Sequence, residues 1–132
     1  MPLTKATQNV ITAYPSDTTI NGVAIGRGAG NINSNTVLGA GSLQANTTGY
    51  NNTAVGVQTL DSNTTGINNT AVGTLALQAS VLYSNTSGIG YDAQVSGDNQ
   101  VRIGNSSVTS VTCQTNAWSD ELPILTWLSP ET

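Results

Sequence analysis

The chain has 132 residues, of which only 3 are basic and 7 acidic, with one cysteine, Cys113, and no histidine. This length corresponds to a single domain, and a lone thiol excludes an internal disulfide and is typical of a small buried side chain. The basic residues Lys5, Arg27 and Arg102 lie far apart in the sequence, so we expect no nucleic-acid binding, which requires clustered cations.

The first twenty residues carry no repeat. The stretch MPLTKATQNVITAYPSD contains Pro2 and Pro15 and little charge, and it lacks the basic and apolar regions of a signal peptide. No run in the chain approaches the roughly 18 apolar residues of a membrane span, so we expect no contact with a membrane. We interpret residues 1–20 as an extended arm that attaches the protein to a larger assembly, the alternative being a loose terminus.

Six similar segments follow, over residues 21–104. They read NGVAIG, SNTVLG, NNTAVG, NNTAVG, NTSGIG and NQVRIG, and their final glycines stand at positions 26, 39, 56, 73, 90 and 104. A recurrence every 13 to 17 residues is typical of stacked supersecondary units, and Gly, Asn and Thr at this density disfavour helix. The sequence therefore predicts an all-β fold, a left-handed parallel β-roll or β-helix built from 13–17-residue repeats.

Each repeat is expected to contain a short strand. A branched aliphatic residue precedes each glycine, and it shares a strand face with the residue two positions earlier. We predict that this face lines the interior of the coil, while the intervening residues, small in five repeats and Arg102 in the last, point outward. Leucines four positions after the glycine should close the other side, giving two strands per coil. The predicted core ladder is Val23, Ile25, Leu38, Val55, Val72, Ile89, Val101, Ile103, Leu43, Leu60 and Leu77.

Asparagine and glycine mark the turns of the repeat. Both tolerate left-handed backbone, and stacked asparagine side chains can hydrogen-bond along a ladder. The predicted turn ladder is Asn21, Asn51, Asn68, Asn85, Asn99, Gly26, Gly39, Gly56, Gly73, Gly90 and Gly104.

A single chain of this kind would be only marginally stable. Each coil buries about three aliphatic side chains, worth about 1.5–3 kcal/mol each, whereas ordering about 17 residues costs roughly 1–2 kcal/mol per residue. Burial of the small outer faces against sister chains would offset this cost, so we predict a cyclic homo-oligomer.

The repeats resemble those of known surface proteins. NGVAIGRGAG resembles the head repeats of trimeric autotransporter adhesins, and NNTAVGVQTLDSNTTG more closely resembles repeats of phage tail fibres and other virion appendages. The stretch from Val101 to Asp120 is similar to the segment that precedes a C-terminal intramolecular chaperone domain in those appendages. The resemblance implies a homotrimeric parallel β-roll. Only twelve residues follow Asp120, so no Ser or Lys of the chaperone domain is carried over. An autotransporter would need a signal peptide and a membrane-anchoring barrel, and because we recognise neither in this sequence, the autotransporter head fragment is a distant alternative.

The remaining segment, residues 105–132, contains both tryptophans. Clustered aromatic and aliphatic side chains form either a cap on the trimer or a docking surface. The candidate cap or docking residues are Trp118, Leu122, Ile124, Leu125, Trp127 and Leu128.

No motif in the chain indicates catalysis. Asp120 and Glu121 are adjacent and point in different directions on an extended chain, and Asp92 and Asp98 lack a further ligand residue such as histidine. The glycine-rich GRGAG lacks the Lys-Ser/Thr of a phosphate loop. We expect no enzymatic activity, no metal and no cofactor.

These features together predict a non-enzymatic structural protein of a phage virion, assembled in the host cytoplasm. We expect a short homotrimeric knob, either a capsid decoration or cement protein or a small appendage, in contact with the major capsid protein or another virion protein. The alternative is a tail-fibre protein or an adhesin whose Asn, Thr and Tyr side chains bind a host surface glycan.

Overall fold

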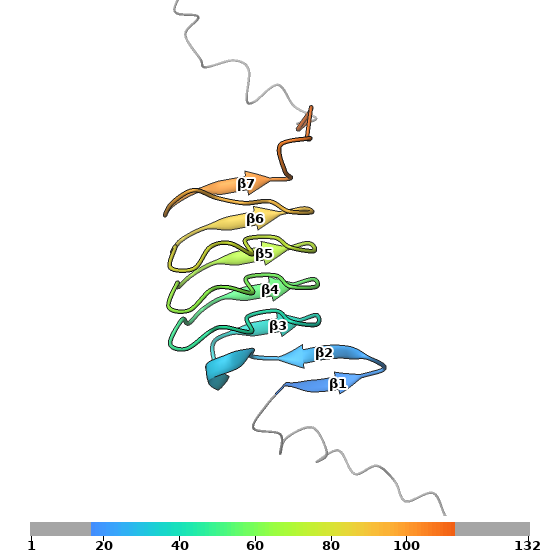
Figure 1. Cartoon of the computed structure of the whole chain (residues 1–132), viewed down its shortest axis with the longest axis vertical. Coiled ribbons are helices and arrows are strands. Elements are labelled where there is room, and N and C mark those ends of the chain that lie inside the picture. Colours follow the sequence, from blue (N-terminus) through green and yellow to red (C-terminus); the bar gives the residue numbers. More distant parts are fainter. Residues whose placement is uncertain (1–16, 113–132) are drawn as a thin grey trace, which may run out of the picture.

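The computed structural model describes residues 17–112. Over this range the protein is all-β, with almost no helix, and forms a β-solenoid of about four turns (Figure 1). The predicted all-β solenoid of stacked repeats is therefore confirmed. Its elements are β1 (Thr18–Ile20), β2 (Val23–Gly26), the 3-10 helix η2 (Ala29–Asn31), β3 (Thr36–Leu38), β4 (Thr53–Val55), β5 (Thr70–Val72), β6 (Ser87–Ile89) and β7 (Val101–Ile103).

The strands form one sheet in the order of the sequence, from β1 to β7. Strands β3 to β7 pair in parallel, and equivalent positions of successive repeats face each other, as in Leu38 with Val55 and Val55 with Val72. In Figure 1 the five strands lie one above another, connected by loops that return on the far side of the coil. The solenoid thus stacks its repeats in register.

The first repeat does not form a coil. Strand β2 pairs antiparallel with β1, because Asn21 and Gly22 form a two-residue turn between them with φ of 50° and 84°. Strand β2 also pairs antiparallel with β3. Positive φ at both turn positions is the signature of a tight hairpin. The parallel stack therefore starts at β3, and β1 lies within the segment that the sequence assigned to an arm.

The second predicted strand of each coil is also absent within residues 17–112. On the side opposite the strands the chain passes through turns, where Leu43, Leu60 and Leu77 have φ of 50°, 50° and 52°. Left-handed backbone is incompatible with an extended strand, and leucine rarely adopts it. Each coil therefore consists of one short strand and a series of turns.

The strand faces are the reverse of the prediction. The central residue of each strand points inward: Val37, Ala54 and Ala71 are buried together with Leu43, Leu60 and Leu77 in one core cluster. The aliphatic residues expected in the interior lie on the outer face instead. The misplaced residues are Val23, Ile25, Leu38, Val72, Ile89, Val101 and Ile103, which are exposed, and Val55, which is half-buried.

The size of the leucine explains this reversal. Leu43, Leu60 and Leu77 fill much of the interior, and Ala54, Ala71 and Gly88 are the small strand residues that fit beside them; Val37, in the first coil, is the larger exception. A Cβ atom added to Gly88 would stand 2.6 Å from Cγ of Leu77, closer than carbon atoms pack. A branched aliphatic residue at position 88 would collide with Leu77, whereas the first coil accommodates Val37 in the same core cluster as Leu43. In the coils after the first, the larger residues therefore occupy the opposite face of the strand.

A buried column of polar side chains joins the coils beside the leucines. The backbone N–H of Asn52 donates to Oδ1 of Asn35 at 2.9 Å, and the N–H of Asn69 donates to Oδ1 of Asn52 at 3.0 Å. Each of these amides also donates through Nδ2 to a backbone carbonyl, for example from Asn52 to Gly66 at 2.8 Å. Buried amides with all groups paired fix the register of the stack.

Candidate interaction surface

The outer face of the sheet carries a continuous line of aliphatic side chains, one from each of β2 to β7. We call it the outer stripe; it consists of Ile25, Leu38, Val55, Val72, Ile89 and Ile103. The strand register places each of these residues directly opposite the next. With strands about 4.8 Å apart, the stripe is about 24 Å long.

The outer stripe is accessible in the single chain. Five of its six residues are between 39% and 47% exposed, and no other described element covers this face of the sheet (Figure 1). Hydroxyl side chains line it on the same face, two residues earlier in four strands; these are Thr36, Thr53, Thr70 and Ser87. Contiguous exposed aliphatic residues with a polar border are typical of a protein–protein contact.

The turn asparagines form a second regular array on the surface. Nδ2 of Asn51 donates to Oδ1 of Asn68 at 3.2 Å, and the bond is repeated from Asn68 to Asn85 and from Asn85 to Asn99 at 3.0 and 3.2 Å. All four residues have left-handed backbone, with φ between 57° and 59°. Asn21 does not join this ladder, because it lies in the β1–β2 hairpin.

Most of the predicted turn glycines stack on one another. Gly39, Gly56, Gly73, Gly90 and Gly104 have positive φ. A Cβ atom on Gly73 would lie 2.6 Å from the carbonyl oxygen of Gly90, so only glycine fits this column. Gly26 differs, because it has no positive φ and lies against the carboxylate of Asp17.

Three carboxylates of the described segment accept hydrogen bonds from neighbouring turns. Asp17 accepts hydrogen bonds from the backbone N–H groups of Arg27 and Gly28 at 2.6 and 2.9 Å, which fills the glycine-rich GRGAG turn with the protein's own anion. Asp98 accepts from the N–H of Ser84 at 2.8 Å. Asp92 accepts from Nε2 of Gln94 at 3.0 Å. Each of these carboxylates therefore stabilises a turn.

Neither a metal centre nor a membrane span is found between residues 17 and 112. No three residues among the histidines, cysteines, aspartates and glutamates of that range are grouped to hold a metal ion. No helix there is long and apolar enough to cross a bilayer. The candidate cap residues Trp118, Leu122, Ile124, Leu125, Trp127 and Leu128, and also Cys113, lie outside the described residues.

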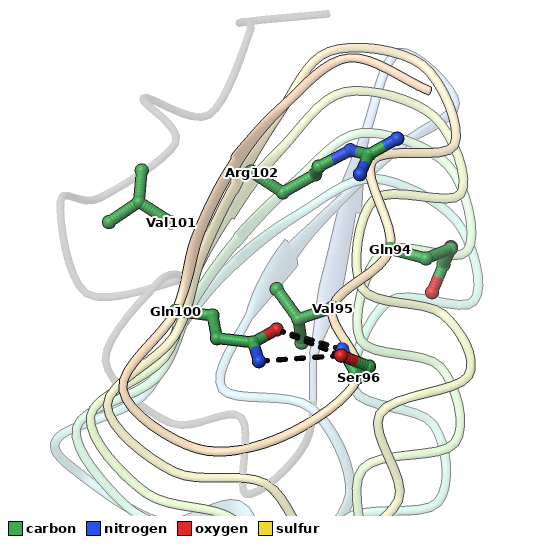
Figure 2. Close-up of a pocket in the computed structure, with 6 residues that line it drawn as sticks. All are labelled: Gln94, Val95, Ser96, Gln100, Val101 and Arg102. Atoms are coloured by element: carbon green, nitrogen blue, oxygen red, sulfur yellow. Dashed lines mark hydrogen bonds between the residues drawn. The ribbon is translucent and has the colours of Figure 1, made fainter. Parts of the chain in front are cut away.

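A pocket of about 460 Å³ lies at the end of the solenoid formed by β7 (Figure 2). Arg102 crosses this end from the position that Val37, Ala54 and Ala71 hold in earlier coils, and its Nε donates to the carbonyl of Gly104 at 3.0 Å. The lining residues are Gln94, Val95, Ser96, Gln100, Val101 and Arg102.

Sequence reasoning missed the buried polar column of Asn35, Asn52 and Asn69. The sequence does contain a pattern that indicates this column, because a polar residue stands four positions before the glycine in every repeat from the second onward.

Comparison of the chain with protein-family models, curated proteins and solved structures found no match.

Proposed function

We propose that the protein is a non-enzymatic structural protein that assembles as a homotrimer through the outer stripe. The observation that carries this proposal is the alignment of six aliphatic residues on an uncovered sheet face. Three chains around a common axis would bring three stripes together, with one layer of three aliphatic side chains at each strand level. Closed cyclic assembly of identical chains is the usual form of soluble oligomers.

The stripe has enough apolar surface to stabilise such an assembly. Full burial of a valine, leucine or isoleucine side chain contributes about 1.5–3 kcal/mol. Because the stripe residues are already more than half buried in the single chain, covering all six would contribute about 4–8 kcal/mol per chain. This contribution is comparable to the whole folding stability of a small domain.

The proposed biological setting rests on the repeat itself. The resemblance of NNTAVGVQTLDSNTTG to repeats of phage virion appendages supports a place on a phage particle. We propose a short surface knob, a capsid decoration or cement protein or a small appendage, in contact with the major capsid protein or another virion protein. A solenoid of about four turns fits a knob better than a long fibre.

The assembly is tested by the mass of the full chain in solution. We expect three times the chain mass of 13.5 kDa by native mass spectrometry and sedimentation. Val72→Asp, in the stripe, should give folded single chains, because three carboxylates would otherwise be buried together at one level. Val81→Asp is the matched control, since Val81 is a similarly exposed valine outside the sheet, and it should remain trimeric. A wild-type mass of one chain would refute the trimer.

The virion assignment needs a separate measurement. Quantitative mass spectrometry of purified phage particles gives the copy number of this chain relative to the major capsid protein. Hundreds of copies indicate a decoration protein, and a few dozen or fewer indicate a tail or vertex appendage. Absence from the particles would overturn the assignment and leave the trimer untouched.

A further inference from the structure

The inner face of the sheet carries one column of side chains that ends in an opposite charge at each end of the solenoid. From β2 to β7 the strand register aligns Gly26, Val37, Ala54, Ala71, Gly88 and Arg102 in this inner column. The β1–β2 register, continued by one pair, places Asp17 opposite Gly26, and a Cβ atom on Gly26 would lie 2.7 Å from Cα of Asp17. The inner column therefore begins at a carboxylate and ends at a guanidinium.

The strands at the two ends run in the same direction. Strands β1 and β7 are the first and last of the sheet, so each leaves one edge without a strand partner among residues 17–112. Because two antiparallel pairings separate β1 from β3, β1 points the same way as β3 to β7, as the arrows in Figure 1 show. A second copy stacked beyond β7 in the same orientation would add its β1 as a parallel strand. Open strand edges are templates for such pairing with another chain.

We propose that β1 of one copy pairs with β7 of the next, so that copies stack head to tail with Asp17 against Arg102. In the register that continues the inner column, Arg102 faces Asp17 of the neighbouring copy and Ile103 faces its Thr18. Because Thr18 pairs with Ile25 of the outer stripe within its own chain, the stripe also continues from copy to copy. The contact goes beyond the proposed function, since it joins one knob to the next.

The two charged groups have the capacity to pair. Nε of Arg102 donates to the carbonyl of Gly104 at 3.0 Å, whereas its two Nη groups have no hydrogen-bond partner within the described range. In Figure 2 this guanidinium lies across the end of the coil. The carboxylate of Asp17 accepts three hydrogen bonds from two backbone N–H groups, and a carboxylate has about four acceptor sites. An acceptor site therefore remains for a guanidinium of the neighbouring copy.

The other charged groups at these ends already hold their own chain. The guanidinium of Arg27 donates to Oδ1 of Asn33 at 2.6 Å, in the turn that follows η2. At the β7 end, the carboxylates of Asp92 and Asp98 accept hydrogen bonds from groups of the last two coils. The charges of the inner column are thus the ones that a second copy meets.

Charge also selects this arrangement over the other two ways of joining ends. Two β7 ends placed together would bring two Arg102 guanidinium groups into one contact, and two β1 ends would bring together two Asp17 carboxylates. Burial of like charges is strongly unfavourable, whereas an arginine and a carboxylate form a charge-assisted pair. A head-to-tail contact joins two different surfaces, so it leaves one end of each kind open and does not close.

The contact is small, which sets the conditions of the test. It consists of one short strand pair and one ion pair per chain, and contacts well below about 1,200 Å² are typical of weak association. We therefore expect stacking only at high protein concentration, and less of it at high ionic strength, because salt screens the ion pair.

Sedimentation velocity and light scattering of the full-length chain over a concentration series test the stacking. The wild-type mass should rise through successive multiples of the mass at the lowest concentration. Arg102→Glu should lose every species above that mass, whereas Arg102→Lys should keep them. Asp17→Asn retains a side-chain oxygen for the N–H groups of the GRGAG turn, so it should fold and stack more weakly. Circular dichroism checks that each variant is folded.

The matched control is the double substitution Gln58→Glu with Thr65→Glu. Both residues are exposed and lie between β4 and β5, and the pair changes the net charge by the same two units as Arg102→Glu. This control should stack like the wild type. Loss of stacking in the control as well would attribute the effect of Arg102→Glu to net charge and overturn the pairing.

A mixing experiment tests the direction of the stack. Folded Arg102→Glu, added to wild type at about one part in ten, should shorten the stacks, because its β1 end still binds but its β7 end does not receive the next copy. A wild-type mass that never rises, that stops at two units, or that rises equally in Arg102→Glu would overturn the proposal. The mass at the lowest concentration, one chain or three, tests the trimer separately, so failure of stacking leaves the proposed function untouched.

Discussion

Ser80→Asn is predicted to stabilise the solenoid by completing a buried ladder. Asn46, Asn63 and Ser80 stand at equivalent turn positions, and the backbone N–H of each donates to the carbonyl of the leucine three residues earlier. Nδ2 of Asn63 donates to Oδ1 of Asn46 and to the carbonyl of Gly66, both at 3.2 Å. Oδ1 of Asn63 and Oγ of Ser80 are buried without a partner among the described residues.

The expected gain follows from counting the new bonds. An asparagine at position 80, with the backbone unchanged, would donate Nδ2 to Oδ1 of Asn63 and to the carbonyl of Tyr83. That carbonyl accepts from Asn69, whereas the equivalent carbonyl of Gly66 accepts from both Asn52 and Asn63. Two added hydrogen bonds are worth about 1–3 kcal/mol in the free energy of unfolding, while one unpaired buried oxygen replaces another.

Urea unfolding at fixed protein concentration measures this gain. The midpoint should rise for Ser80→Asn with an unchanged slope. Ser106→Asn, at an exposed position, is the matched control and should be neutral. A lower or unchanged midpoint for Ser80→Asn would refute the reasoning, because it would mean that Oδ1 of Asn63 is already satisfied or that the turn cannot hold a larger side chain.

Two further substitutions test the packing of the coils. Gly73→Ala places a Cβ atom 2.6 Å from the carbonyl of Gly90 at a φ of +126°, so we expect loss of the folded state by circular dichroism; a folded variant would show that the column is not closely stacked. Leu60→Ala should lower the free energy of unfolding by about 2–5 kcal/mol. Val57→Ala, at a residue that is 46% exposed, should lower it by less than about 1 kcal/mol, and equal costs at the two sites would contradict the observed interior.

Residue spacing predicted the repeats and the leucine column, because the glycines and leucines of a solenoid recur once in each coil. It did not predict the strand faces. Alternation in a three-residue strand separates two sets of side chains but does not say which set is inside, and the default of burying the larger set fails where Leu60 and Leu77 already fill the interior. The pair Asn21-Gly22 is typical of a two-residue hairpin turn. Because NGVAIG is similar to the later repeats, it was nevertheless predicted to form a coil like them.

The corrected faces change what a mutation is expected to do. With Val72 in the interior, Val72→Asp would unfold the chain; with Val72 on the outer stripe, the same substitution leaves the fold and removes the assembly. One measurement distinguishes an interior Val72 from an outer one, namely the circular dichroism spectrum of Val72→Asp at low protein concentration. A folded spectrum supports the outer position, and an unfolded one, at a concentration where dissociated wild-type chains remain folded, supports the interior position.

The reversal also couples folding to assembly under the proposed trimer. The interior of one chain is narrow and partly polar, with the small strand residues Ala54, Ala71 and Gly88, so much of the available aliphatic burial is left for the contact between chains. Association of folded chains stabilises the folded state by an amount that rises with the logarithm of the protein concentration. The melting temperature of the wild type should therefore rise with protein concentration, whereas that of Val72→Asp should be lower and independent of it. A wild-type melting temperature that does not change on dilution, with a mass of three chains throughout, would mean that the trimer does not dissociate on unfolding and would contradict this coupling.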